Sequence, residues 1–220
     1  MAEPAAHHMS VEEFFLWQER QTERFELVDG IPVPLRAMTG ASRQHDRITV
    51  NLVGELRNRL RGKPCVTFTP DTAVRTRPGT LRRPDAGVDC GPFRPDERVA
   101  SEPTLVVEVL SPSTRATDLF QKTDEFRNVA TIAYILLIEP NEARVLLRAR
   151  DEEGNWHDHL IEGLDAAVDL PRLGISLPLA EIYADVPLRP RPRLLEGFDE
   201  DGQPVYWFEE PEETLGPAER

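Results

Sequence analysis

The sequence has very little lysine, very little cysteine and no long apolar segment. Of its 26 basic residues, only Lys63 and Lys122 are lysine. No run approaches the roughly eighteen apolar residues that a membrane-spanning helix needs, and the first residues lack the basic start and apolar middle of a signal peptide. These absences argue against a membrane protein, and we expect a cytoplasmic one.

The two cysteines, Cys65 and Cys90, show none of the spacings typical of a metal site. A disulfide between them is one possibility. We expect two buried thiols instead, because cysteine usage follows the redox state of the compartment and a cytoplasm is reducing. A zinc site built on cysteine is not expected.

Negative charge dominates the composition, with a formal net charge of −13. Such a chain is unsuited to coating nucleic acid without selectivity. Basic residues nevertheless cluster between Arg57 and Arg83, where only Asp71 opposes them. This cluster is either a local surface that contacts phosphates or an ordinary solvated face, and the sequence leaves both readings open.

A chain of 220 residues is long enough for one good core and a short appendage. We expect one folded domain over residues 1–186. Residues 187–220 form a proline-rich, acidic extension that we expect to be partly disordered. Its aromatic group Tyr206–Phe208 is expected to dock on the domain or on a partner.

Local patterns predict an α/β fold. Ser10 and Glu13 form a capping-box pattern before a helix over 11–17, and Asp29-Gly30 between apolar runs is a hairpin-turn signal. A longer helix is expected over 42–61, because apolar residues recur there on one stripe. Further strands are expected over 66–69, 72–77, 84–89, 105–110, 134–139, 145–150 and 156–161, the last three antiparallel, with helices over 118–129 and 179–184.

Glu108 interrupts the apolar run Leu105–Leu110, which has the character of a strand buried on both faces. A carboxylate in such a strand must be ion-paired, protonated or bound to a metal, because burying an isolated charge costs several kcal/mol. Glu108 is therefore a candidate site residue. The alternative is a buried salt bridge.

Lys122 is anomalous in the same way. Leu119, Lys122, Phe126 and Val129 fall on one helical stripe that should face the sheet. In a chain that otherwise uses arginine, this one compact ammonium is suited to act as a point charge beside a phosphate or a water molecule. The alternative is a lysine that extends along apolar surface to reach solvent.

Asp85 begins a strand that could lie beside the Glu108 strand. Two carboxylates at adjacent strand ends suit a hard cation such as magnesium. Taken alone, Asp85 is as well explained as a turn residue.

Together these motifs resemble the Uma-type family of restriction endonucleases, in the PD-(D/E)XK nuclease superfamily. The resemblance covers about residues 10–186 and depends on motifs in this order: Phe25–Gly30, His45, Arg83-Pro84-Asp85, Val107–Ser113, and Asp118 with Lys122. It implies a restriction-endonuclease-like core, a mixed β-sheet flanked by helices with an antiparallel C-terminal strand run. It also implies a magnesium-dependent endonuclease, with manganese as an alternative metal.

The resemblance further implies roles for individual residues. Asp85, Glu108 and the carbonyl of Val109 would bind the metal, and Lys122 would orient or deprotonate the attacking water. Glu26 would add a carboxylate, directly or through water. The superfamily places its lysine two residues after the glutamate, where this chain has a leucine, so Lys122 must reach the site from the neighbouring helix.

DNA is the expected substrate by resemblance, and a homodimer is the expected assembly because cleavage of both strands would favour a dimer. A nuclease fold that binds or regulates without cleaving is the alternative, and a hydrolase of another phosphate ester is a third reading. His45 could approach the substrate or cap its helix, and we favour a structural or supporting role. His157 and His159 share one strand face, as metal ligands might, but we assign them to a solvated strand edge. Ser111 and Ser113 lack a paired histidine, so nucleophilic catalysis is not expected.

Overall fold

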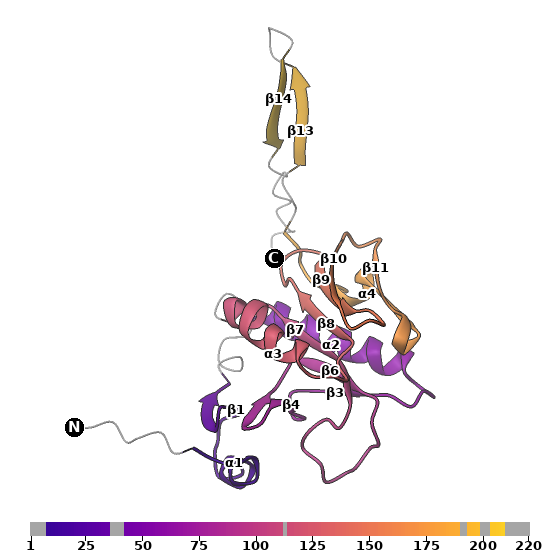
Figure 1. Ribbon diagram of the computed structural model, residues 1–220. Coiled ribbons are helices and arrows are strands. Elements are labelled where there is room, and N and C mark those ends of the chain that lie inside the picture. The colour runs from indigo at the N-terminus through magenta and orange to yellow at the C-terminus, as the bar shows by residue number, and fades with distance from the viewer. Residues whose placement is uncertain (1–7, 36–41, 112–113, 190–192, 199–202, 210–220) are drawn as a thin grey trace, which may run out of the picture.

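The computed structural model describes residues 8–35, 42–111, 114–189, 193–198 and 203–209. A six-stranded sheet in the order β10-β9-β8-β7-β6-β3 forms its centre (Figure 1). β7 and β8 are parallel and the other neighbours are antiparallel. The strands are β3 (Val66–Phe68), β6 (Ala86–Asp89), β7 (Pro103–Val109), β8 (Tyr134–Ile138), β9 (Arg144–Arg150) and β10 (Trp156–Glu162). The expected mixed sheet with antiparallel C-terminal strands is confirmed.

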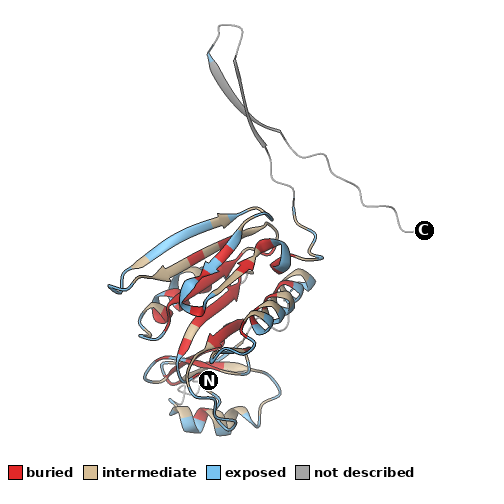
Figure 2. Cartoon of the chain, turned by 90° about the vertical axis from the view of Figure 1, so that its right-hand side faces the viewer, coloured by how far each residue is buried: buried red, intermediate tan, exposed pale blue. Residues whose placement is uncertain are grey.

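β7 lies at the centre because both of its faces are apolar. Val107 packs in a cluster with α2 (Arg43–Arg59), whereas Val106 packs on the opposite side with Phe126 of α3 (Thr123–Arg127). Figure 1 shows the two helices on either side of the central strands, and Figure 2 shows those strands as the buried layer. Glu108 is therefore buried within an otherwise apolar strand, as the sequence pattern predicts.

A second, four-stranded sheet is built mainly from the N-terminal part of the chain. Its order is β2-β1-β5-β4, and α1 (Val11–Gln18) packs against it with the capping box that Ser10 and Glu13 predict. Asp29 and Gly30 both have positive φ in the two-residue turn, as a type I′ hairpin requires. The strands are β1 (Phe25–Val28), β2 (Ile31–Pro34), β4 (Val74–Arg77) and β5 (Thr80–Arg82).

A small C-terminal layer covers the α2 face of the central sheet. It comprises β11 (Ala167–Leu170), the 3-10 turn η3 (Pro171–Leu173), β12 (Ile175–Pro178) and α4 (Leu179–Ile182). Lys63 donates hydrogen bonds to the carbonyls of Leu173 and Gly174 at the end of η3. One of the two lysines is thus structural. The strand pair β11–β12 and the short strand β5 were not expected from sequence.

Gly87 is required by a close contact across the β3–β6 pair. Phe68 is its register partner, and a Cβ atom on Gly87 would lie 2.2 Å from the Phe68 ring. We expect Gly87→Ala to lower the free energy of unfolding by about 1–3 kcal/mol, because the ring must move within a packed core. Urea denaturation measures this.

Gly54→Ala is the matched control, since nothing lies within 4 Å of a Cβ there and the site is inside α2. That substitution should raise the free energy of unfolding by about 0.5–1 kcal/mol. Equal effects at the two glycines would contradict the contact with Phe68.

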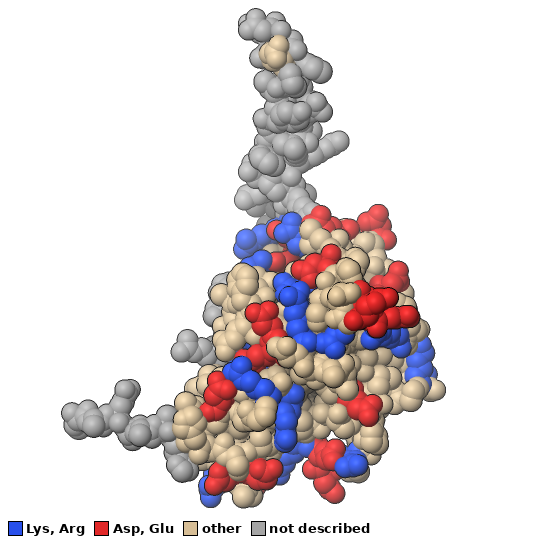
Figure 3. All heavy atoms as spheres, in the orientation of Figure 1, with Lys and Arg blue, Asp and Glu red and all other residues tan. Residues whose placement is uncertain are grey.

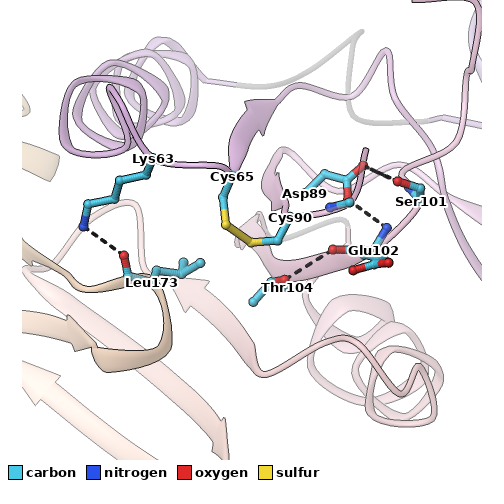
Figure 4. Close-up of a disulfide and its surroundings, with 9 residues drawn as sticks. Lys63, Cys65, Asp89, Cys90, Ser101, Glu102, Thr104 and Leu173 are labelled. Carbon is cyan, nitrogen blue, oxygen red and sulfur yellow. Dashed lines mark hydrogen bonds between the residues drawn. A yellow bond between two sulfur atoms is a disulfide. The ribbon is translucent and has the colours of Figure 1, made fainter. Parts of the chain in front are cut away.

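The expectation of two free thiols is wrong, because Cys65 and Cys90 form a disulfide (Figure 4). The register of β3 with β6 pairs Val66 with Asp89, which brings the two flanking cysteines opposite each other. Disulfides are rare in reducing compartments. A cytoplasmic location therefore loses the support of free thiols and stays a prediction.

We expect the double variant Cys65→Ser/Cys90→Ser to lower the free energy of unfolding by about 3 kcal/mol, because the bond spans 25 residues and restricts the unfolded chain. A reductant should lower the denaturation midpoint of the wild type and leave that of the double variant unchanged. If the wild type keeps its midpoint in reductant, the bond contributes no stability.

The basic cluster between Arg57 and Arg83 is divided between the interior and the surface. Arg82 and Arg83 are buried, Arg59 is paired with Glu55, and Arg77 is paired with Asp29. On the face shown in Figure 3, basic and acidic side chains are interspersed. The phosphate-contact reading is therefore wrong for the buried arginines, which stabilise the interior instead.

The C-terminal extension contains one hairpin, β13 (Arg193–Phe198) with β14 (Pro204–Glu209). The docking expected of Tyr206–Phe208 concerns side chains outside the described part, and the partial disorder expected for 187–220 concerns in part residues that are not described. Both stay predictions, as does the boundary at residue 186. No helix in the described ranges combines the length and apolar character that crossing a bilayer requires.

Candidate active site

The pairing of β6 with β7 places Asp85 beside Glu108. Ala86 is opposite Val107 in this antiparallel pair, so the preceding residue on one strand lies next to the following residue on the other. The backbone N–H of Val109 donates to Asp85 Oδ2 over 2.7 Å. This hydrogen bond fixes the carboxylate against the end of the central strand.

Lys122 brings its ammonium group to the same region from the neighbouring helix. Its Nζ atom lies 3.0 Å from Glu108 Oε1, to which it donates a hydrogen bond, and 3.6 Å from Glu26 Oε1. It also lies 3.1 Å from Asp118 Oδ1. The structure therefore gathers three carboxylates around one buried cation.

The helix that carries Lys122 differs from the regular helix expected over 118–129. Its first part is a π-helix, η2 (Thr117–Lys122), and only Thr123–Arg127 is α-helical. Both Asp118 and Lys122 are buried in this segment. Wide turns of this type often occur at functional sites.

Negative charge exceeds positive charge around Glu108. Burial raises the pKa of Glu108 well above its usual value, and the nearby charges of Asp118, Asp85 and Glu26 raise it further, against the single opposing effect of Lys122. Burial alone would lower the pKa of Lys122, but the surrounding carboxylates outweigh burial and raise it. Lys122 is therefore held as an ammonium ion.

A second buried cation, Arg82, stabilises the site through its contacts with Glu26 and Glu125. Its guanidinium makes two hydrogen bonds of 2.7 Å to Glu125 and one of 2.9 Å to Glu26 Oε2. Thr76 also donates to Glu125, over 3.2 Å. Since all three charged groups are buried, each depends on the others for its stability.

Both carboxylate oxygens of Glu26 accept hydrogen bonds from neighbouring arginines. Oε2 accepts from Arg82, and Oε1 accepts the backbone N–H of Arg83 over 2.9 Å while facing Lys122. Its contacts are those of a residue that positions Lys122. Of this network, the sequence predicts Glu26, Glu108 and Lys122 as site residues and includes Asp118 in the motif, but it does not predict Arg82, Glu125 or the ion pair of Asp118 with Lys122. The spacing of Asp118 and Glu125, four before and three after Lys122, was the available signal.

His45 contacts the other carboxylate of the site. Its Nε2 atom lies 3.2 Å from Asp85 Oδ2, and α2 presents it there from its first turns. Burial lowers the pKa of His45, but the hydrogen bond and charge of Asp85, together with the Val109 carbonyl, outweigh burial and raise it. The supporting role expected for His45 thus has a definite geometry, between Asp85 and Val109.

The donor set fits a divalent cation with a preference for oxygen. Asp118 Oδ1 is buried and makes no hydrogen bond with proper geometry among the described residues, although Lys122 is close to it. In the described ranges, no group of three or more acidic, histidine or cysteine side chains is placed so that it could hold a metal ion. Magnesium commonly uses only one or two carboxylates, completed by water and phosphate oxygens. Asp85 and Glu108 supply that number of carboxylates at the ends of two adjacent strands.

The two histidines of β10 lie on the edge strand of the central sheet, and β9 and β8 separate them from β7. His157 is exposed and its Nε2 is 2.8 Å from Asp151 Oδ2. His159 is exposed as well. Both therefore have the solvated positions expected from sequence.

Comparisons with known proteins give one consistent picture. Residues 11–180 match the family model Uma2, described as "Putative restriction endonuclease". The chain is 32% identical over 179 residues to an uncharacterized protein of Synechocystis sp., covering 80% of this chain and 91% of that protein. Its fold is similar to the crystal structure of a putative nuclease belonging to DUF820 from Anabaena variabilis, with a TM-score of 0.62 and 16% identity over 80% of this chain and 98% of the other.

Proposed function

The chain belongs to the Uma2 family of putative restriction endonucleases, which supports a nuclease function, and we propose that it is a metal-dependent endonuclease that hydrolyses phosphodiester bonds in DNA. The observation that supports this most directly is the meeting of Glu108 and Lys122, 3.0 Å apart, beside Asp85 at the ends of two adjacent strands. Carboxylates and an ammonium ion are the groups that this chemistry requires.

Each side chain has a distinct task in this proposal. Asp85 and Glu108, with the Val109 carbonyl, would hold Mg²⁺ or Mn²⁺, which supplies Lewis acidity at the phosphate and lowers the pKa of a bound water. Lys122 orients the attacking water and stabilises the negative charge that develops on the phosphate. Glu26 holds the Lys122 ammonium in place, and His45 holds Asp85.

The direct test is cleavage of supercoiled plasmid in Mg²⁺ or Mn²⁺, with Asp85→Asn and Glu108→Gln as variants that keep the size of each side chain. The wild type should nick or linearise the plasmid, and chelation of the metal should stop it. Both variants should lose cleavage together with metal binding measured by calorimetry. Cleavage that persists in both variants would place the activity elsewhere or in a contaminant.

One observation favours a second function, a nuclease fold that binds nucleic acid or regulates a partner without cleaving. Asp85 is already engaged by His45 and Val109, while Glu108 is already engaged by Lys122. A site closed by its own ion pairs binds a metal only if these contacts open. DNA binding without cleavage at any metal concentration would support this alternative.

A further inference from the structure

The two edges of the central sheet differ in how well they are protected. The β3 edge is only 3 residues long, whereas the β10 edge is 7 residues long and pairs with β9 without any register shift. Natural edge strands avoid pairing with other chains by being short or by carrying charged side chains, proline or a bulge. β10 has no proline and no bulge, and its two acidic side chains are paired within the chain, Asp158 with Arg127 and Arg148 and Glu162 with Arg144.

Hydrogen bonds around β9 show which backbone groups of β10 point outward. Arg150 N–H donates to the Ala133 carbonyl. The backbone N–H and C=O groups of Arg150, and of every second residue before it in β9, therefore point toward β8. The backbone groups of the intervening residues of β9 point toward β10. In agreement with this, Gly163 N–H donates to the Ala143 carbonyl over 2.9 Å. Because these groups alternate in direction along an antiparallel strand, the backbone N–H and C=O groups of the even-numbered residues of β10 point away from β9.

Asp158 and Leu160 are the central outward-facing residues. Their backbone N–H and C=O groups have no backbone partner in the described part of the chain. The Leu160 side chain is 58% exposed. The Asp158 carboxylate is 3.3 Å from Arg127 and 3.6 Å from Arg148, so its charge is balanced within the chain.

We propose that β10 pairs antiparallel with β10 of a second copy of this chain, across a twofold axis at His159. In this register Asp158 of each copy exchanges both backbone hydrogen bonds with Leu160 of the other. Shifting the axis by one residue in either direction would place carboxylates directly opposite each other, Asp158 against Asp158 or against Glu162, which is unfavourable. The charge pattern of β10 thus favours the axis at His159 over the two neighbouring positions.

The pairing joins the two central sheets into one continuous sheet. A single strand pair buries less area than a standard interface, so we expect a dissociation constant on the order of micromolar. This inference concerns assembly alone. Its test does not depend on whether the protein is a nuclease.

Leu160→Pro in the full chain is the most specific test, because proline removes an N–H group that has no partner among the described residues. Proline is tolerated on an edge strand where its N–H would face solvent. By sedimentation equilibrium, the wild type should approach twice its chain mass of 24.9 kDa, and the proline variant should dissociate about thirty-fold more readily, for two lost hydrogen bonds per dimer. Leu160→Thr is the matched control, since it keeps the N–H group, and should dimerise like the wild type.

His159→Lys is the second variant, should the proline disturb folding. It leaves the β9 ladder intact but places two ammonium groups opposite each other at the axis, and we expect it to be monomeric. Amide exchange of Asp158 and Leu160 should slow as wild-type concentration rises. A monomeric wild type at high concentration, or a lysine variant that dimerises as tightly as the wild type, would overturn the proposal.

Discussion

Replacing Arg82 by methionine should lower the free energy of unfolding by about 3–5 kcal/mol, because removing one partner of a buried ion network leaves the others uncompensated. Glu26 and Glu125 are both buried and both receive their short hydrogen bonds from this guanidinium. Methionine keeps most of the apolar stem, so the loss comes from the charge. Urea denaturation followed by circular dichroism measures it.

Arg75→Met is the matched control for this experiment. Arg75 is an exposed arginine on β4, close in sequence to the network but outside it, and its replacement should change stability by less than about 0.5 kcal/mol. Adding Glu26→Gln and Glu125→Gln to Arg82→Met should recover part of the loss, since the two carboxylates that lost their arginine are then replaced by neutral amides. Similar losses in Arg75→Met and Arg82→Met would contradict the network.

The pH dependence of the Arg82→Met deficit follows from Glu125. Burial would raise the pKa of Glu125, but its hydrogen bonds to Arg82 and Thr76 outweigh burial and lower it below the ordinary 4.5. A lowered pKa contributes stability that is present above the unfolded value and is lost as the pH falls through the folded value. The deficit of the variant should therefore be largest near neutral pH and shrink below about pH 4.5.

Lys122→Met should reduce the rate of plasmid cleavage by about 10²–10³-fold, the usual cost of removing one charge-stabilising group from a transition state. Its effect on metal binding should have the opposite sign. Without the ammonium, Glu108 and Asp118 face less positive charge, so Mn²⁺ should bind at least as tightly as to the wild type. Single-turnover cleavage and calorimetric titration measure the two quantities.

Lys63→Met is the control for Lys122→Met, because Lys63 is the other lysine of the chain and bonds to the carbonyls of Leu173 and Gly174. It should keep full cleavage activity. Should Lys122→Met cut as fast as the wild type while remaining folded, Lys122 has a structural role only. Wild-type protein without any cleavage would instead refute the proposed function.

The sequence is informative about this site wherever a polar residue breaks an apolar pattern. Glu108 and Lys122 stand out because the strand and the helix around them are otherwise arranged to face a core, and the structure places them together. Asp85 is weaker as a signal, because its meaning depends on the register between β6 and β7. Propensity and periodicity do not give the register of distant strands.

Other contacts could not be predicted because they depend on long-range geometry. Arg82 is in a strand of only 3 residues, too short to show alternation, and lies among other arginines that suggest a solvated face. The disulfide of Cys65 with Cys90 likewise depends on how β3 aligns with β6. In both cases the local sequence is compatible with exposure, and only tertiary pairing brings the groups inside.

The scarcity and burial of lysine have a practical consequence for chemical labelling. Amine-directed reagents attack the neutral amine, and Lys122 is only 7% exposed with a raised pKa, so its amine is both shielded and protonated. Modification of the folded chain should therefore be confined to Lys63 and the terminal amine. Acylation of Lys122, read by mass spectrometry, then becomes a selective reporter of any opening of this region, and amine coupling to a solid support should leave Lys122 untouched.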